Sequence, residues 1–162
     1  MATAAIHQGS FQSIPSSGSP GLAWLKTFLP ILDSLEPEDT KLLPGYLAPS
    51  ATFTINNSAP QCAEQVLPLL AMRSNGLSRF WHDVHTAWDI SKGDVGGRTV
   101  MYEATSTTVF KADPEAQEVQ VKEFNVVELV RGEDGKLRAL ELRSYMDPAP
   151  VSARAQTIMA KP

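Results

Sequence analysis

The chain has 162 residues, a hydrophobic fraction of 43% and a formal net charge of −4. This length suits one domain, which would bury roughly 70% of its unfolded surface around an ordinary core. The acidic balance and the absence of a basic run argue against a nucleic-acid binder. No apolar stretch approaches the roughly 20 residues that cross a bilayer, so no membrane partner is expected.

The sequence also indicates a compartment. Cys62 is the only cysteine, which excludes an intramolecular disulfide and fits a reducing environment. The first residues lack the cationic segment and apolar core of a secretory signal. We therefore expect a cytoplasmic protein.

The first part of the chain predicts a tail followed by helices. Residues 1–20 are rich in Ser, Gly, Pro and Ala without periodicity, which predicts a flexible N-terminal tail. Apolar residues at helical spacing predict a helix over 21–35, which Pro30 should kink or end early. A short helix should follow through Leu43, and a longer one over 63–74. The domain is expected to span 21–150, with a C-terminal tail over 151–162.

The second part of the chain predicts strands. A first strand is expected over 50–57, and four long ones follow the helices, over 79–90, 98–111, 117–130 and 136–146. Turn residues separate the last four, and such short connections imply antiparallel hairpins. The fold class is therefore α+β, with a strongly curved antiparallel sheet wrapped around the N-terminal helices.

The last strand places a row of polar side chains on one face. Alternation puts Glu141, Arg143, Tyr145 and Asp147 together. Asp147 could abstract a proton next to a carbonyl while Tyr145 or Arg143 stabilises the enolate. Alternatively, Arg143 forms a surface ion pair with Glu141 or Glu123, and Asp147 accepts backbone hydrogen bonds where the strand ends.

His82 is the strongest candidate for acid–base chemistry. Alternation over 79–90 gives one largely apolar, inward face, made of Phe80, His82, Val84, Thr86 and Trp88. A histidine there could act as general acid or base. The alternative is a neutral core histidine bonded to the backbone.

No metal or nucleotide site is predicted. His85 points to the opposite face from His82, and one cysteine cannot make a zinc set. The glycines of 93–97 indicate only a hairpin turn, so no cofactor is expected.

Three further residues are candidates for the lining of a pocket. Glu123 and Asn125 share a face of a strand that is apolar on both sides, so they need hydrogen-bond partners. Those partners could be a ligand, or a structural network with Arg143. We expect Tyr102, rather than Glu103, to face inward on the preceding strand.

Several segments together carry a resemblance to a known family. They are 24–35, Phe53-Thr54-Ile55-Asn56, His82-Asp83-Val84-His85, Gly135-Lys136-Leu137 and Tyr145-Met146-Asp147-Pro148. Over about 21–150 the chain resembles the SnoaL-like polyketide cyclases of the nuclear transport factor 2-like superfamily. The resemblance implies a cone with an internal pocket, a homodimer and small hydrophobic substrates. Aldol cyclases, ketosteroid isomerase and scytalone dehydratase are relatives whose acid–base chemistry uses Asp, His and Tyr without a cofactor.

The chain departs from that family at one position. The cyclases place their catalytic aspartate on the last strand, soon after the Gly-Lys turn, and direct counting puts Leu142 there. Asp147 lies beyond it, and a bulge or register shift would be needed to bring it back toward the pocket.

These observations predict a cofactor-independent isomerase, cyclase or dehydratase acting on a small hydrophobic carbonyl metabolite, polyketide-like or terpenoid-like. In this hypothesis His82 and Asp147 are the catalytic residues that transfer protons. The residues that contact the substrate are Trp88, Tyr102, Glu123, Asn125, Arg143 and Tyr145. One alternative is a non-catalytic dimeric module that binds a hydrophobic ligand or a partner protein. Another is an accessory protein whose outer sheet face, including Trp81, is its interface.

Overall fold

The computed structural model describes residues 3–93 and 96–160, so the ends of both expected tails and residues 94–95 of the expected 93–97 turn lie outside it. In chain order the elements are β1 (Ala4–Gln8), a 3-10 turn (Phe11–Ser13), α1 (Pro20–Asp33), α2 (Pro37–Thr40), a 3-10 turn (Leu43–Tyr46), β2 (Leu47–Ile55), β3 (Gln61–Cys62), α3 (Ala63–Gly76), β4 (Leu77–Ser91), β5 (Arg98–Phe110), β6 (Val119–Arg131), β7 (Leu137–Met146) and α4 (Ala149–Met159).

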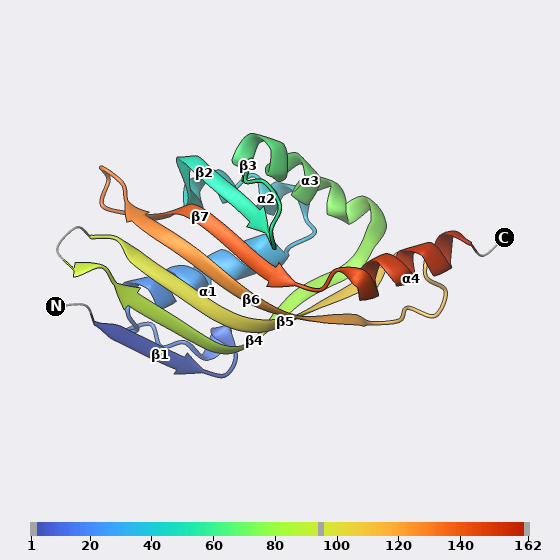
Figure 1. Cartoon of the computed structure of the whole chain (residues 1–162), viewed down its shortest axis with the longest axis horizontal. Helices are drawn as coiled ribbons and strands as arrows, with labels where there is room; N and C mark the ends of the chain where they lie inside the picture. Colours follow the sequence, from blue (N-terminus) through green and yellow to red (C-terminus); the bar gives the residue numbers. More distant parts are fainter. Residues whose placement is uncertain (1–2, 94–95, 161–162) are drawn as a thin grey trace.

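One seven-stranded sheet organises the molecule, in the order β1-β4-β5-β6-β7-β2-β3. Neighbouring strands are antiparallel except β2 and β7, which pair in parallel, and the elements between them along the chain provide the crossover that a parallel pair needs. Figure 1 shows α1 lying behind the sheet and α3 above the edge formed by β2 and β3. The predicted α+β class is confirmed, and the sheet remains open.

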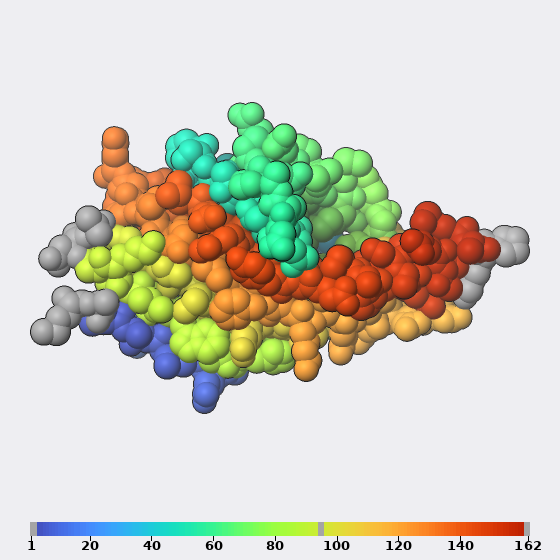
Figure 2. All heavy atoms as spheres, in the orientation of Figure 1, coloured from blue at the N-terminus to red at the C-terminus, as the bar shows by residue number. Residues whose placement is uncertain are grey.

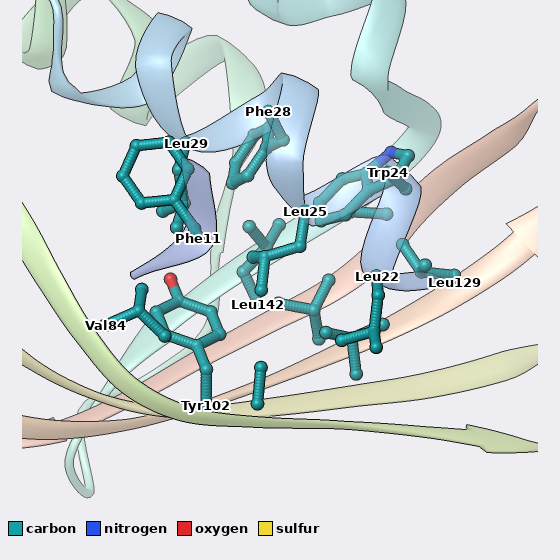
Figure 3. Close-up of a cluster of buried hydrophobic side chains, with 14 of the residues drawn as sticks. Phe11, Leu22, Trp24, Leu25, Phe28, Leu29, Val84, Tyr102, Leu129 and Leu142 are labelled. Carbon is teal, nitrogen blue, oxygen red and sulfur yellow. The ribbon is translucent and has the colours of Figure 1, made fainter. Parts of the chain in front are cut away.

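Helix α1 supplies the core that fills the inner face of the sheet. Its buried apolar residues recur at helical spacing, as in an amphipathic helix. Trp24 stacks on Phe28 with ring centroids 4.4 Å apart. Figure 3 shows these side chains above the sheet, with Tyr102 rising toward the helix. The helix continues past the exposed Pro30 and ends at Asp33, so Pro30 does not end it.

The N-terminus of α1 is fixed to β4 by a buried carboxylate. Asp89 is fully buried and accepts a hydrogen bond from the backbone N–H of Gly21 at 2.8 Å. Arg98 Nε donates to the same carboxylate at 2.7 Å. A buried charge is tolerated when it is paired and hydrogen-bonded, so this contact fixes one end of the helix.

Both expected tails contain regular structure. Within 1–20, β1 pairs with β4, and Phe11 and Ile14 are buried. The composition of this segment does not reveal the free edge of β4 that it covers. At the other end, α4 is held by Arg154, whose Nε donates to Asp113 at 2.9 Å and whose Nη2 donates to both oxygens of the same carboxylate at 2.6 Å.

A bulge in β4 changes which side chains face inward. Val84 pairs with Ala104 and Thr86 with Glu103, so His85 is an extra residue in the ladder. Ahead of the bulge His82 and Val84 are buried, and beyond it Ala87 and Asp89 are buried instead. The inward face predicted from simple alternation is therefore right for His82 and wrong for Trp88.

Candidate functional site

A cavity of about 420 Å³ lies between the inner face of the sheet and α3. Figure 2 shows the hollow between α3, in green, and the end of β7 with α4, in orange and red. Its walls are mainly apolar, with residues such as Leu32, Phe80 and Leu142. Charged or amide side chains enter this lining from several elements: Gln61, Arg73, His82, Glu123 and Asn125. A mainly apolar pocket with a few convergent polar groups is the usual form of a small-molecule site.

His82 is held between two carboxylates. Its backbone N–H donates to Asp33 Oδ2 at 2.8 Å, and its ring Nδ1 bonds to Asp33 Oδ1. Its Nε2 lies 2.8 Å from Glu123 Oε1. The three side chains are 7%, 11% and 2% exposed for His82, Asp33 and Glu123. We call this arrangement the Asp33–His82–Glu123 triad.

The triad continues into a chain of hydrogen bonds along the cavity wall. Asn125 Nδ2 donates to Glu123 Oε1 at 2.8 Å, and Ser144 Oγ donates to Asn125 Oδ1 at 2.5 Å. The pairing of Asn125 with Ser144 across β6 and β7 brings the two side chains to one face. Glu123 and Asn125 thus find partners in His82 and Ser144, not in Arg143.

The two carboxylates set the charge of the triad. Burial opposes a charge on His82, but the hydrogen bonds and negative charges of Asp33 and Glu123 outweigh it and raise the pKa of His82 to about 10. Burial likewise opposes the charge of Glu123. The hydrogen bond and positive charge of His82, together with the hydrogen bond from Asn125, nevertheless lower the pKa of Glu123 below its ordinary value. At neutral pH the triad therefore contains an imidazolium and an ionised Glu123.

Tyr102 offers a hydrogen-bond donor to the cavity. Burial, and then the charges of Glu123 and Asp33, raise the pKa of Tyr102 well above its ordinary value, so it stays a phenol. Its hydroxyl makes no hydrogen bond to another residue in the ranges that the structure describes. Tyr102 lines the cavity, as the sequence predicted.

Three of the expected substrate contacts lie on the other face of the sheet. Leu142, Ser144 and Met146 of β7 line the cavity, so the intervening Arg143 and Tyr145 point outward. Arg143 bonds to Glu128 at 3.4 Å and approaches Glu141, and Tyr145 is 42% exposed. Trp88 packs against Phe124 on this outer face, with centroids 6.4 Å apart. In this geometry Trp88, Arg143 and Tyr145 do not contact a ligand in the cavity.

Asp147 is also placed outside the cavity. It is exposed, follows the end of β7 and accepts a hydrogen bond from the backbone N–H of Ala149 at 3.0 Å. Asp147 therefore accepts a backbone hydrogen bond at the start of α4. This agrees with the alternative interpretation from the sequence, in which Asp147 accepts backbone hydrogen bonds where the strand ends. The geometry does not bring Asp147 and His82 into one proton-transfer pair.

Asp33, Ser144 and Arg73 take part in the site and were not predicted from the sequence. Asp33 occupies the last position of α1, so its role depends on the helix continuing through Pro30. Ser144 shares the cavity face of β7 with Leu142 and Met146, and this face is opposite the polar row. Arg73 lies in the last turn of α3, where a positive charge is ordinarily explained by the helix dipole.

Two other features bear on the class of site. Among the described residues, no group of His, Cys, Asp and Glu side chains has an arrangement that could hold a metal ion. No helix in the described ranges is long and apolar enough to cross a membrane.

The sequence matches no family model and no curated protein. The structure is similar to that of a protein described as a scytalone dehydratase from Novosphingobium aromaticivorans (8% identity, TM-score 0.65, 79% of this chain and 82% of that one). It is also similar to a protein described as a SnoaL-like polyketide cyclase from Jannaschia sp. CCS1 (17% identity, TM-score 0.62, 88% and 94%). A third similar structure is a pinacolase from Penicillium brevicompactum (12% identity, TM-score 0.60, 83% and 90%).

These identities are too low to establish a shared reaction, because one fold hosts many chemistries. The structural similarity establishes the fold alone. The expected resemblance to SnoaL-like members of the nuclear transport factor 2-like superfamily is confirmed at that level.

Proposed function

Starting from the nuclear transport factor 2-like fold of this chain, we propose that it catalyses cofactor-independent acid–base chemistry on a small hydrophobic carbonyl compound. The reaction class is isomerisation, cyclisation or dehydration. The observation that supports this most directly is the Asp33–His82–Glu123 triad at the wall of a mainly apolar cavity. Buried titratable groups with strongly shifted pKa values are typical of catalytic sites.

Glu123 is the proposed base. It lines the cavity and is held in its ionised form by His82. It accepts a proton from the carbon next to the substrate carbonyl, and the electrons of that C–H bond move into the carbonyl to give an enolate. The neutral Glu123 then returns the proton to another carbon in an isomerisation. In a dehydration, the neutral Glu123 instead gives that proton to the departing hydroxyl, which leaves as water.

Tyr102 and His82 are the proposed stabilisers of the enolate. The phenol of Tyr102 has a donor available toward the cavity, and the imidazolium supplies positive charge beside the reacting atoms. Donors arranged in advance around a developing oxyanion are worth several kcal/mol in other enzymes, about 3–4 kcal/mol for a single donor. Asp33 does not line the cavity and is a positioning residue that holds the ring of His82.

Deuterium exchange tests this proposal without knowledge of the natural substrate. β-Tetralone, a two-ring hydrophobic ketone, is incubated with the protein in D₂O, and loss of the protons next to its carbonyl is followed by NMR. The wild-type protein should accelerate exchange, and His82→Gln should slow it by at least about 100-fold. Asp147→Asn, outside the cavity, should exchange at the wild-type rate. Equal rates for wild type and His82→Gln would remove the catalytic role of His82.

The proposal includes a homodimer in the cytoplasm. It is supported by the aromatic side chains of Trp88, Phe124 and Tyr145, which remain partly exposed on the outer face of the sheet. Aromatic residues of this kind are enriched at protein interfaces.

A further inference from the structure

Arg73 is the one charged residue of the cavity lining that has no charged partner among the described residues. Its Nε donates to the backbone carbonyl of Leu70 at 3.3 Å, and its Nη2 donates to the carbonyls of Leu32 and Ser34. No carboxylate forms an ion pair with it in the described ranges. The two N–H donors of Nη1 therefore have no partner among the described residues and are available to a ligand.

Arg73 lies in partly buried, mainly apolar surroundings, where a positive charge without a negative partner is unfavourable. The guanidinium lies over the ring of Phe80, with Cζ 4.7 Å from the centroid, and the lining on the α3 side is apolar. Burial lowers the pKa of Arg73, and the charge of Asp33 only partly opposes this. Both oxygens of Asp33 already bond to His82. A partly buried cation without a partner is stabilised by any anion that reaches it.

Arg73 also stands close to the proposed reaction centre. The ring of Phe80 that it covers meets the ring of His82 edge to face, with centroids 5.2 Å apart. A ligand with one or two rings that lies along Phe80 would present one end to the Asp33–His82–Glu123 triad and the other to Arg73.

We propose that the substrate carries an anionic group, a carboxylate or an equally acidic oxygen, which Arg73 binds while the carbonyl end lies at the triad. This inference rests on the proposed function for the position of the carbonyl. It narrows the substrate class from hydrophobic ketones to hydrophobic keto acids. Arginine suits this role because its planar fork of N–H groups matches the two oxygens of a carboxylate.

A pair of ligands that differ only in charge tests the inference by binding. β-Tetralone with a carboxylate on its aromatic ring is compared with the methyl ester of the same compound by isothermal titration calorimetry. The wild-type protein should bind the acid at least about tenfold more tightly than the ester, as expected for a charge-assisted hydrogen bond. Arg73→Gln should abolish this preference and leave the affinity for the ester unchanged, and Arg73→Lys should keep part of the preference.

Arg79→Gln is the matched control. Arg79 lies over the ring of Trp81 and pairs with Glu118, away from the cavity lining, so the preference should persist. Equal affinity of the wild-type protein for acid and ester would overturn the inference, as would no measurable binding of either. Equal weakening of both ligands in Arg73→Gln and Arg73→Lys would show that Arg73 only joins α3 to the end of α1.

The two proposals fail separately. A preference for the acid without deuterium exchange would leave Arg73 as an anion-binding residue in a non-catalytic pocket. Deuterium exchange of β-tetralone without a preference for the acid would leave the proposed function intact and remove the inference about Arg73.

Discussion

Asp33 binds His82 at two points, because one carboxylate oxygen accepts the backbone N–H of His82 and the other bonds to its ring Nδ1. The first contact fixes the carboxylate against β4, and the second fixes the rotation of the imidazole. The last residue of α1 therefore sets the direction in which Nε2 points, toward Glu123.

Replacing Asp33 by Asn should weaken both stability and exchange. The change leaves the imidazolium with one carboxylate, and the single oxygen of Asn can replace only one of the two acceptors that hold the backbone and the ring of His82. Breaking a buried ion pair typically costs about 3–5 kcal/mol, and Asp33 retains some exposure, so we expect a loss near the lower end of that range. Urea unfolding measures the stability, and deuterium exchange of β-tetralone should slow by at least about tenfold.

Asp134→Asn provides the comparison for that variant. Asp134 forms an ion pair with Arg138 and is 42% exposed, and surface pairs contribute little to stability. Its unfolding midpoint should match that of the wild type. An Asp33→Asn protein with wild-type stability and exchange would mean that the double contact to His82 is dispensable.

The stability of the fold should decrease in alkaline solution because of His82. Its pKa is about 10 in the folded protein and near 6.5 when unfolded, so the folded state holds this proton more tightly. That contribution is fully present below the unfolded value and is lost as the pH rises through the folded value. Urea unfolding at pH 7 and pH 10 should show a larger loss for the wild type than for His82→Gln. Equal losses would show that His82 is not held as an imidazolium.

The sequence predicted the fold well because its signals are local. Helical spacing in α1 and the turns between long strands do not depend on distant contacts, and they gave the α+β class and most strand positions. Segment 1–20 was misjudged because β1 is defined by its pairing with β4, and pairing partners are not encoded in composition. Asp89 is a second case, because alternation from His82 alone would put it on the opposite face, whereas the bulge at His85 turns it inward.

The candidate site was predicted in part. His82, Tyr102, Glu123 and Asn125 line the cavity because ahead of the bulge, and on β5 and β6, simple alternation holds. Arg143, Tyr145 and Asp147 formed a conspicuous polar row, yet such a row on an open sheet is equally typical of its solvated face. Asp33 could not be predicted as the partner of His82, because 49 residues separate them and only packing of α1 on β4 joins them.

Gly21→Ala should destabilise the protein through α1. A Cβ at this position would lie 2.5 Å from the carboxylate of Asp89, which is itself fully buried and bonded to Arg98. The helix or the carboxylate must shift, and forcing extra atoms into a packed interior typically costs about 1–3 kcal/mol. Thermal unfolding would measure the change.

Gly45→Ala is the control for that substitution, because a Cβ at Gly45 meets no atom within 4 Å. Its melting temperature should stay close to that of the wild type. A Gly21→Ala protein as stable as Gly45→Ala would indicate that the contact between α1 and Asp89 adapts freely.

The outer face of the sheet should control assembly and not exchange. Trp88 and Tyr145 lie on this face, away from the cavity. Replacing both with Ser should shift the sedimentation coefficient from that of a dimer to that of a monomer, while β-tetralone exchange stays at the wild-type rate per chain. Sedimentation of the wild-type protein as a monomer would rule out the homodimer.

The rate of β-tetralone exchange in Glu123→Gln tests the central claim most directly, because Gln keeps the size of Glu123 but cannot accept the proton. With Glu123 as the base, the exchange rate should fall by at least about 100-fold. Circular dichroism should confirm that the fold is retained, and Asp147→Asn should exchange like the wild type. A folded Glu123→Gln protein that exchanges β-tetralone at the wild-type rate would contradict the proposal that the Asp33–His82–Glu123 triad transfers the proton.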